Sequence, residues 1–333
     1  VKFPSDGGST ADWVKDTVYR YTFSSQGDEQ DDEFDLSLDA EWNVHDNVIK
    51  PNFYVNEDYG IKGFALNKIV FGGVYETQSS ELDLPGIYGN IIDVNCSDIV
   101  TGGNFQANTF GNTCHEMRFA RNVSFNTFGQ LCAGINTGNL CYANEFGAYD
   151  SALTLEGGFC FNTVGEYAYR WEIGTECESC TFANWVWSIK MGNKCKYNHF
   201  DNYAGHGGQE FEDHFQIKMG KSCCGNTFGE YCGGIQLGRL TTVEGQEVLL
   251  GNCNYNTFGN GCINFSLGYG CDYNTLGVGC SNIDFGDLSN SNTFGDKCSN
   301  ISLAKEYDVL KDDGPEDLPA YIVNNTFGSC CSD

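Results

Sequence analysis

The sequence predicts an all-β fold, specifically a β-solenoid (β-helix) with 18-residue coils, each made of two nonapeptide half-repeats. Three observations predict it: a tetrad that recurs every 18 residues, a second series of tetrads midway between the first, and an unusual composition. The 333 residues include 42 glycines and 18 cysteines but only 5 prolines. Together with abundant Phe and Tyr, this composition favours strands joined by many turns, and helix is expected to be a minor component.

The tetrad Asn-Thr-Phe-Gly, with its variants, sets the coil length. Its basic spacing is 18 residues, and the longer intervals are interpreted as coils with loops inserted near residues 204–214, 239–251 and 304–318. Because one asparagine recurs per coil, stacking predicts a structural ladder in which amides about 4.8 Å apart bond to one another and to turn backbone. The ladder positions are Asn108, Asn126, Asn144, Asn162, Asn198, Asn226, Asn256, Asn274, Asn292 and Asn325.

The second series divides each coil into halves of nine residues. Gly259, Gly268 and Gly277 begin an unbroken run of glycines at intervals of nine. Nine is odd, so the in–out alternation must reset at a turn in each half, and glycine is the residue expected in that turn. The Phe, Leu or Met before each glycine is expected to point inward, as is the residue four positions later, which is commonly Cys.

Most cysteines share one phase of the half-repeat, which indicates a packing role. Thiols directly above one another on parallel strands fit disulfide geometry poorly, so we expect mostly free thiols and assembly in a reducing or anaerobic environment. A cross-coil disulfide and a zinc site are the competing interpretations, the latter because of Cys177-x-x-Cys180 and the adjacent Cys223 and Cys224. A single CxxC pair without a nearby histidine supports zinc poorly, so we expect no metal and no cofactor.

The run Asn126-Thr-Phe-Gly-Gln-Leu-Cys132 and its counterpart from Asn256 to Cys262 carry a resemblance to a known group. Over residues 91–331 the chain resembles the Asn-Thr-Phe-Gly-x-x-Cys repeat proteins of Bacteroides and related gut bacteria and their phages. The resemblance implies a role in a phage tail or in host attachment, a location on the virion or the bacterial cell surface, and other virion or appendage subunits as partners. A homo-oligomer, for example a trimer, is a further expectation.

The calcium-binding β-roll also pairs nonapeptides into coils. Its turns need Gly-Gly-x-Gly-x-Asp, a series that this sequence lacks, so calcium-dependent folding is not implied.

Residues 1–90 lack the repeat and are predicted to form a small β-rich N-terminal cap or connector ahead of a repeat domain at 91–333. A solenoid end exposes unpaired strand edges that such a segment would cover. The chain begins with Val1 rather than Met, which leads us to expect a fragment or a processed form. The sequence contains neither a signal-peptide pattern nor an apolar stretch long enough for a membrane span.

The chain is strongly acidic, with 45 Asp and Glu against 18 Lys and Arg and a formal net charge of -27. Such a charge repels a phosphate backbone, and no cluster of Lys and Arg is expected to offset it locally, so we expect no nucleic-acid partner. The acidic run from Asp28 to Asp35 is interpreted as a solvated loop rather than a calcium site.

Aromatic residues occupy one position, three residues after the tetrad Phe or its equivalent, in five successive coils. If they face outward they form a stripe that sugar rings, another subunit or an inserted loop would cover; if they face inward they replace the thiols. Both arrangements remain open from the sequence. The candidate binding residues are Tyr149, Tyr167, Trp185, Tyr203 and Tyr231, with Tyr169 and Trp187 two positions beyond their neighbours in the stripe.

The loop after Tyr203 adds a cluster of ionisable groups. His206 and His214 are further binding candidates, and Glu210, Glu212 and Asp213 are weak catalytic candidates. Paired carboxylates beside a sugar platform could support glycoside hydrolysis, but this chemistry needs a defined carboxyl separation and one raised pKa. No G-x-S-x-G, P-loop or H-E-x-x-H motif offers another chemistry.

These patterns favour a structural or receptor-binding β-solenoid module of a phage tail or bacterial surface appendage, with glycan or cell-surface polysaccharide as the expected ligand. A polysaccharide-degrading enzyme, either a glycoside hydrolase or a depolymerase, is one alternative. A ligand-free structural spacer is the other.

Overall fold

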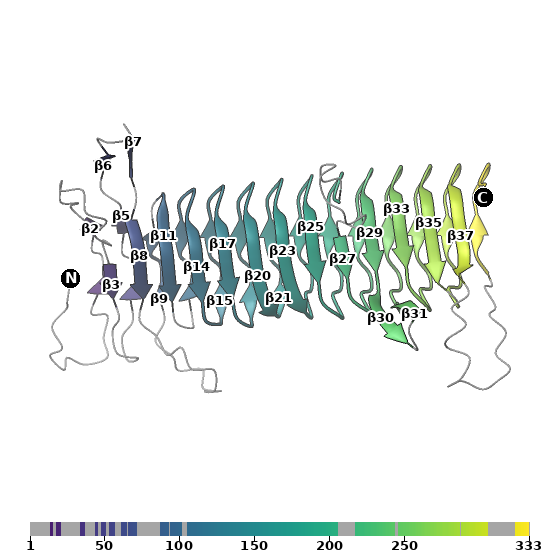
Figure 1. Ribbon diagram of the computed structural model, residues 1–333, viewed down its shortest axis with the longest axis horizontal. Coiled ribbons are helices and arrows are strands. Elements are labelled where there is room, and N and C mark those ends of the chain that lie inside the picture. Colours follow the sequence, from purple (N-terminus) through teal and green to yellow (C-terminus); the bar gives the residue numbers. More distant parts are fainter. Residues whose placement is uncertain are drawn as a thin grey trace. The chain divides into compact units, whose positions relative to one another are not determined.

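The computed structural model describes residues 87–92, 94–101, 105–205, 217–243, 246–286, 288–305 and 324–332, together with the strands that lie within residues 14–71. These residues form strands and turns and no helix, which confirms the all-β prediction. The chain divides into two compact units, Val1–Gly165 (unit 1) and Glu166–Asp333 (unit 2). In each unit, successive coils place parallel strands side by side, as Figure 1 shows, so each is a β-solenoid.

Unit 1 has three parallel sheets, and each coil contributes one strand to each sheet. The first sheet contains β1 (Val14–Lys15), β4 (Val44–His45), β9 (Ile87–Tyr88), β12 (Phe105–Gln106), β15 (Val123–Ser124), β18 (Cys141–Tyr142) and β21 (Phe159–Cys160). The second contains β2 (Val18–Arg20), β5 (Val48–Lys50), β10 (Ile91–Ile92), β13 (Thr109–Phe110), β16 (Thr127–Phe128), β19 (Glu145–Phe146) and β22 (Thr163–Val164). The third contains β3 (Phe34–Leu36), β8 (Leu66–Phe71), β11 (Cys96–Thr101), β14 (His115–Phe119), β17 (Ala133–Thr137) and β20 (Ser151–Gly157).

Unit 2 continues the pattern with two sheets. One contains β24 (Thr181–Phe182), β26 (His199–Phe200), β28 (Thr227–Phe228), β32 (Thr257–Phe258), β34 (Thr275–Leu276), β36 (Thr293–Phe294) and β38 (Thr326–Phe327). The other contains β23 (Tyr169–Thr175), β25 (Trp187–Met191), β27 (Ile217–Met219), β29 (Gly233–Leu237), β33 (Ile263–Leu267), β35 (Ser281–Gly286) and β37 (Ser299–Lys305). On the remaining side, the described residues form only the isolated bridge between Glu178 and Lys196.

Strand pairing crosses residue 90, the boundary expected between the N-terminal cap and the repeat domain. Strand β8 pairs in parallel with β11, with Ile69 opposite Ile99, and β5 pairs with β10 in the same way. The strands of the first 71 residues therefore extend the three sheets of unit 1, although they lie ahead of the tetrad repeat. A separate antiparallel hairpin, β6 (Phe53–Asn56) with β7 (Ile61–Phe64), also lies in this part of the chain.

The described insertion near 239–251 is also a hairpin, formed by β30 (Arg239–Val243) and β31 (Gln246–Leu250), as Figure 1 shows. The insertions near 204–214 and 304–318 lie largely outside the described residues. The described residues include no helix with the length and apolar character needed to span a membrane.

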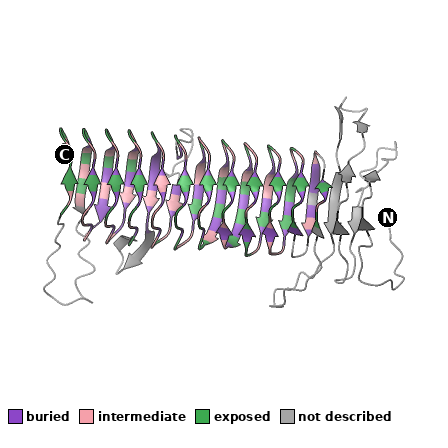
Figure 2. Cartoon of the chain, turned by 180° about the vertical axis from the view of Figure 1, so that it is seen from behind, coloured by how far each residue is buried: buried purple, intermediate pink, exposed green. Residues whose placement is uncertain are grey.

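Inward-pointing tetrad aromatics form the core of each unit. The rings of Phe110 and Phe128 stack with centroids 4.8 Å apart and an interplanar angle of 3°, which is the spacing expected between adjacent strands. In unit 2, Phe182, Phe200 and Phe228 form an equivalent column. The alternation of buried and exposed positions along the strands is visible in Figure 2, and the Phe before each tetrad glycine is buried in these coils.

The tetrad asparagines form a buried hydrogen-bonded column in each unit. The Oδ1 atom of Asn126 accepts hydrogen bonds from both the backbone amide and the side-chain amide of Asn108, at 2.9 and 3.1 Å. Its own Nδ2 donates to the carbonyl oxygen of Phe105 at 3.0 Å. In unit 1 the column begins with Asn90, which lies outside any full tetrad. In unit 2 the coil without the asparagine uses Cys180, whose amide donates to Asn198 Oδ1 at 3.0 Å.

The turns contradict the role expected for glycine. A single coil of unit 2 contains four corner residues with positive φ, and none of them is glycine: Ser179 (55°), Trp185 (60°), Ser188 (55°) and Lys194 (60°). The tetrad glycines have ordinary φ values instead. They are needed because the coils approach closely: a Cβ on Gly259 would lie 2.6 Å from the backbone of Gly229 in the preceding coil.

The phased cysteines fill two inward columns, one for each half-repeat. Cys232, Cys262, Cys280 and Cys298 follow the tetrad, whereas Cys177, Cys195, Cys223, Cys253 and Cys271 precede it, and all are buried. Every one of the 18 cysteines is recorded as a free thiol. The redox environment in which the protein assembles stays a prediction.

Candidate functional site

The candidate aromatic residues of unit 2 lie on the outside of the solenoid, at a corner. Tyr167, Trp185, Tyr203 and Tyr231 occupy equivalent positions in four consecutive coils, and we call them the aromatic corner. Each has a positive φ, between 56° for Tyr231 and 61° for Tyr167 and Tyr203. This backbone conformation turns the chain from the tetrad strand to the next sheet, and it directs the side chain away from the core. Trp185 is 36% exposed and Tyr231 is 47% exposed.

Neighbouring rings of the aromatic corner stack face to face along the coils. The centroids of Trp185 and Tyr203 lie 4.4 Å apart at 4°, and those of Tyr203 and Tyr231 lie 5.5 Å apart at 14°. The last ring lies over Gly261, where an added Cβ would come within 2.8 Å of Tyr231 ring carbons. The rings from Trp185 to Tyr231 therefore cover one another's faces and present mainly their edges and polar atoms to the outside.

A second aromatic pair follows two residues later on the outer face of the next sheet. Tyr169 and Trp187 are register partners on β23 and β25, and their rings stack at 5.0 Å and 6°. The backbone amides of Trp187 and Gly205 donate to Ala168 and Val186, so Gly205 holds the next position in this column. Because glycine has no side chain, the second face of the Trp187 indole has no aromatic neighbour among the described residues.

A row of amides and carboxylates runs beside the aromatic corner. Asn184 Nδ2 donates to Glu166 Oε1 at 3.1 Å, and Asn202 Oδ1 accepts from the amide of Glu230 at 2.7 Å. Asn260 Nδ2 then donates to Glu230 Oε1 at 3.1 Å. These side chains precede the corner in successive coils and are largely exposed. A ligand at the corner would therefore meet donors and acceptors next to aromatic edges.

This arrangement suits binding to hydroxyl-rich molecules better than it suits catalysis. Amides and carboxylates exchange hydrogen bonds with hydroxyl groups, and an open indole face packs on apolar C–H surface. In the same coils, His199 Nε2 lies 2.8 Å from Asp201 Oδ1, and both side chains are exposed.

The remaining candidates divide between unit 1 and the undescribed loop. Tyr149 occupies the corner position of its own coil in unit 1, has a φ of 63° and is 47% exposed. His206, Glu210, Glu212, Asp213 and His214 lie outside the described residues.

The buried thiols differ in acidity along the columns. Burial raises the pKa of the Cys298 thiol to about 11, and burial together with hydrogen bonds to Cys180 and Cys195 raises the pKa of Cys177 well above its usual value. The thiolate is the nucleophilic form, so these two groups are unreactive near neutral pH. By contrast, hydrogen bonds with Cys177 and Cys223 lower the pKa of the buried Cys195 to about 4, and a hydrogen bond with Cys262 lowers the pKa of Cys232. Within the described part of the chain, no group of three or more His, Cys, Asp or Glu side chains is arranged to hold a metal ion.

Sequence reasoning missed other exposed aromatics at a second corner, immediately before the tetrad asparagine. In unit 2, Tyr255 and Tyr273 stack at 5.1 Å and 4°. In unit 1, Phe125 and Phe161 hold the same position, and each packs edge-on against Tyr142. The signal was present in the sequence, because these residues also recur at the coil period, but fewer consecutive coils carry an aromatic there.

Comparison of the chain with protein-family models, with curated proteins and with solved structures finds no match.

Proposed function

We propose that the chain is a receptor-binding β-solenoid module that recognises glycan and is carried on a phage tail or a bacterial surface appendage. The observation that supports this proposal is the aromatic corner. Its backbone conformation does not require aromatic side chains, because Gly261, Gly279 and Lys297 occupy the same corner position in later coils of unit 2 with similar positive φ values. Four consecutive outward aromatics at such a position, of which Trp185 and Tyr231 are exposed and Tyr167 and Tyr203 half-buried, favour a surface that a partner covers.

The stacking of the rings supports one sugar-binding position over the others. A sugar ring packs through its C–H face against an open aromatic face, and the stacked rings from Trp185 to Tyr231 leave no such face between them. The second face of Trp187 is the best candidate. The exposed Glu166, Asn184 and Asn202 would then contribute hydrogen bonds to hydroxyl groups of the ligand.

A ligand-free structural spacer is the second candidate, and one observation favours it. Rings that cover one another contribute about 0.5 to 1.5 kcal/mol per pair to stability, so a purely structural role would also explain the stacked column. The alternative of a polysaccharide-degrading enzyme depends on Glu210, Glu212 and Asp213, which lie outside the described residues.

The test compares two variants with a matched control on a glycan array and by titration. Trp187→Ala is expected to lose about 1 to 3 kcal/mol of binding energy, by analogy with stacking on other ring systems, and to keep its fold. Trp185→Ala is expected to lose less binding and to lower the free energy of unfolding, because its ring packs against Tyr203 at 4.4 Å. Tyr273→Ala, which removes a stacked ring from the other corner, is the control and should bind normally.

If the parent protein binds no glycan on the array, the recognition proposal is wrong and the spacer is favoured. Release of reducing ends from bacterial surface polysaccharide by the parent protein would instead favour the enzyme. Equal loss of binding in Tyr273→Ala would show that the effect is general and does not come from the face of Trp187.

A further inference from the structure

The acidic chain carries an unexpected basic cluster on two adjacent coils of unit 2. Lys190 and Lys218 are register partners on β25 and β27. The backbone amide of Lys194 donates to the carbonyl oxygen of Lys221 at 2.9 Å, so these residues also lie on adjacent coils. Lys196 follows Lys194 on the same coil. We call Lys190, Lys194, Lys196, Lys218 and Lys221 the lysine cluster. It corrects the expectation that no group of basic residues offsets the net charge locally.

Neighbouring carboxylates neutralise the cluster only in part. Lys190 Nζ lies 3.2 Å from Glu172 Oε1, and Lys194 Nζ lies 3.2 Å from Glu176 Oε1. All four side chains are at least 60% exposed, so each pair contributes little to stability. Lys196 and Lys221 form no ion pair with any residue in the described part of the chain.

Lys190 and Lys218 bring like charges directly opposite one another on neighbouring strands, where such charges repel. Glu172 offsets part of this charge at Lys190, and an anionic group bound there would offset more. Charges further apart than about 8 Å are largely screened at physiological ionic strength, so a bound group responds to this local excess more than to the charge of the whole chain.

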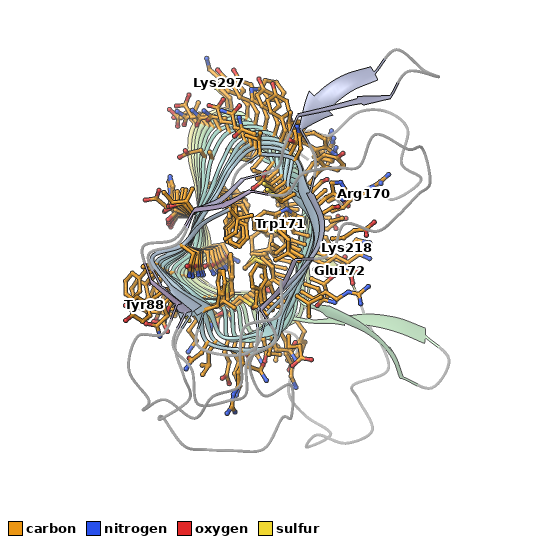
Figure 3. All side chains as sticks on the ribbon, turned by 90° about the vertical axis from the view of Figure 1, so that its left-hand side faces the viewer. Tyr88, Arg170, Trp171, Glu172, Lys218 and Lys297 are labelled. Atoms are coloured by element: carbon orange, nitrogen blue, oxygen red, sulfur yellow. The ribbon has the colours of Figure 1, made fainter. Side chains whose placement is uncertain are left out.

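Lys190 and Lys218 of the lysine cluster lie on the same sheet as the half-buried pair Tyr169 and Trp187, whereas Lys194, Lys196 and Lys221 lie outside its strands. In Figure 3, Arg170, Glu172 and Lys218 project outward from the same side of the coil, whereas Trp171 points into the interior. Arg170 also lies 5.7 Å from the ring centroid of Tyr169, so a further cation sits beside the aromatic pair. On β25, Trp187 and Lys190 are separated by a single turn residue and one buried residue. Cations and an aromatic face therefore occur together on the outside of one sheet.

We propose that this surface binds an anionic polysaccharide, with the lysine cluster recognising its carboxylate or sulfate groups and Trp187 packing against a sugar ring. The inference rests on the proposed glycan-binding function and names its ligand class. Ammonium groups form charge-assisted hydrogen bonds with both kinds of acid group, which are stronger than neutral hydrogen bonds.

Charges along the sheet favour a polysaccharide over a nucleic acid. The outward row across successive strands contains, in order, Glu172, Lys190, Lys218, Gln236, Ser266 and Asp284. Carboxylates therefore lie on both sides of the two lysines. Duplex DNA carries a charge about every 1.7 Å and would meet those carboxylates, whereas a polysaccharide with separated acid groups can place them at the lysines alone.

The experiment measures binding of the parent chain to a polyuronate and to dextran sulfate, with neutral dextran and a single-stranded oligonucleotide as comparisons. The double variant Lys218→Gln/Lys221→Gln is expected to weaken binding to the acidic polymers about tenfold, and Arg118→Gln/Lys297→Gln, which removes the same charge elsewhere, is expected to change it less than about twofold. Thermal unfolding of each variant establishes that the fold is retained. Binding of the parent should also weaken as the salt concentration rises.

The outcomes separate this inference from the proposed function. Binding of the acidic polymers that is unchanged in the lysine variant, or no tighter than binding of neutral dextran, would overturn the inference and leave glycan recognition intact, whereas no binding to any glycan would overturn both. Equal losses in the two double variants, or tighter binding of the oligonucleotide than of the polysaccharides, would overturn the inference. So would a lysine variant that loses self-association in sedimentation experiments, because the cluster would then be an interface between copies of the chain.

Discussion

Each ladder asparagine satisfies polar groups of two coils at once. Asn274 Oδ1 accepts hydrogen bonds from the amide and the side chain of Asn256, at 2.9 and 3.0 Å, while its own amide and Nδ2 donate to Asn292 Oδ1, at 2.8 and 3.1 Å. All three residues are fully buried. The cost of losing one asparagine is therefore the desolvation of its partners, which no water reaches.

Replacing Asn274 with leucine should lower the free energy of unfolding by about 1 to 3 kcal/mol, because buried donors of Asn256 lose their acceptor. Denaturant titration of the variant measures this loss. Asn136→Leu is the control: Asn136 is exposed on β17, so its replacement should change stability by less than about 0.5 kcal/mol. Equal stability of the Asn274 variant and the parent would argue against a ladder that stabilises the fold.

Asp150 places a carboxyl group in the column that holds the buried thiols of Cys114 and Cys132 in the preceding coils. It is fully buried, its Oδ1 accepts a hydrogen bond from the amide of Cys132 at 2.8 Å, and burial, with a smaller contribution from Cys132, raises its pKa to about 9. The unfolded carboxyl titrates near 3.9. Between these values the folded chain keeps a proton that the unfolded chain releases, so stability is full at low pH and falls as the pH rises.

Asp150→Asn should therefore stabilise the chain at neutral pH and flatten the dependence of stability on pH between about 4 and 9. The gain at pH 7 is at most about 4 kcal/mol, and the amide oxygen can keep the hydrogen bond from Cys132. Denaturant titrations of parent and variant at several pH values measure the difference. Two parallel pH curves would show that the carboxyl does not titrate as its burial implies.

At the scale of the coil, the corner positions and the tetrad glycine positions have different structural requirements. Corners need positive φ and accept Tyr, Trp, Ser or Lys, whose side chains extend into open space. The glycine after the tetrad Phe needs no unusual φ. It is required because the backbone of the neighbouring coil lies against its Cα and leaves no room for a Cβ. In unit 2 this column also contains Ala183 and Asp201, so the coil can adjust to a Cβ by a local distortion.

Gly277 and Gly279 allow the effect of close approach between coils to be measured separately from the effect of positive φ. A Cβ on Gly277 would lie 2.7 Å from the backbone of Gly259, whereas a Cβ on Gly279 meets nothing within 4 Å, although Gly279 has a φ of 72°. We expect Gly277→Ala to cost about 1 to 3 kcal/mol through overpacking, and Gly279→Ala to cost about 1 kcal/mol or less through backbone strain alone. The reverse order of the two melting temperatures would contradict the assigned roles.

The repeat made the coil predictable, and the details that escaped prediction involve contacts between coils. The 18-residue period and the inward tetrad Phe follow from counting, because parallel stacking repeats each environment. Spacing alone could not separate a glycine required by φ from one required by close approach, and Gly277 shows the second kind. The spacing of the tetrads also could not predict that β8 (Leu66–Phe71) lies in the same sheet as β11, because the segment that forms β8 lacks the tetrad.

At the candidate site, the period of the repeat predicted which aromatic residues are neighbours but not how their rings are oriented, and their role in binding stays a prediction. The period identified Trp185 and Tyr203 as neighbours, yet outward and inward orientations were both consistent with the pattern. The mutual coverage of their faces depends on side-chain rotamers, which a repeat does not encode. The net charge did not predict the lysine cluster, because it is a sum over the whole chain. Lys190 and Lys218 become neighbours only because the insertion between them lies outside the regular coil.

At the scale of the whole molecule, burial in the columns determines which thiols a reagent can reach. The columns bury most of the 18 cysteines, and Cys330 is exposed, while Cys160, Cys224 and Cys331 are partly exposed. A thiol reagent at neutral pH should therefore label the native chain at a few sites, Cys330 first, and should label most of the 18 after unfolding. Burial keeps the reagent away from the column thiols of the native chain, including Cys195, whose pKa is lowered by hydrogen bonds with Cys177 and Cys223. Reductant should leave the free energy of unfolding unchanged. If the unfolded chain lacks several thiols, and reduction lowers the free energy of unfolding by about 2 kcal/mol or more, disulfides stabilise the coils instead.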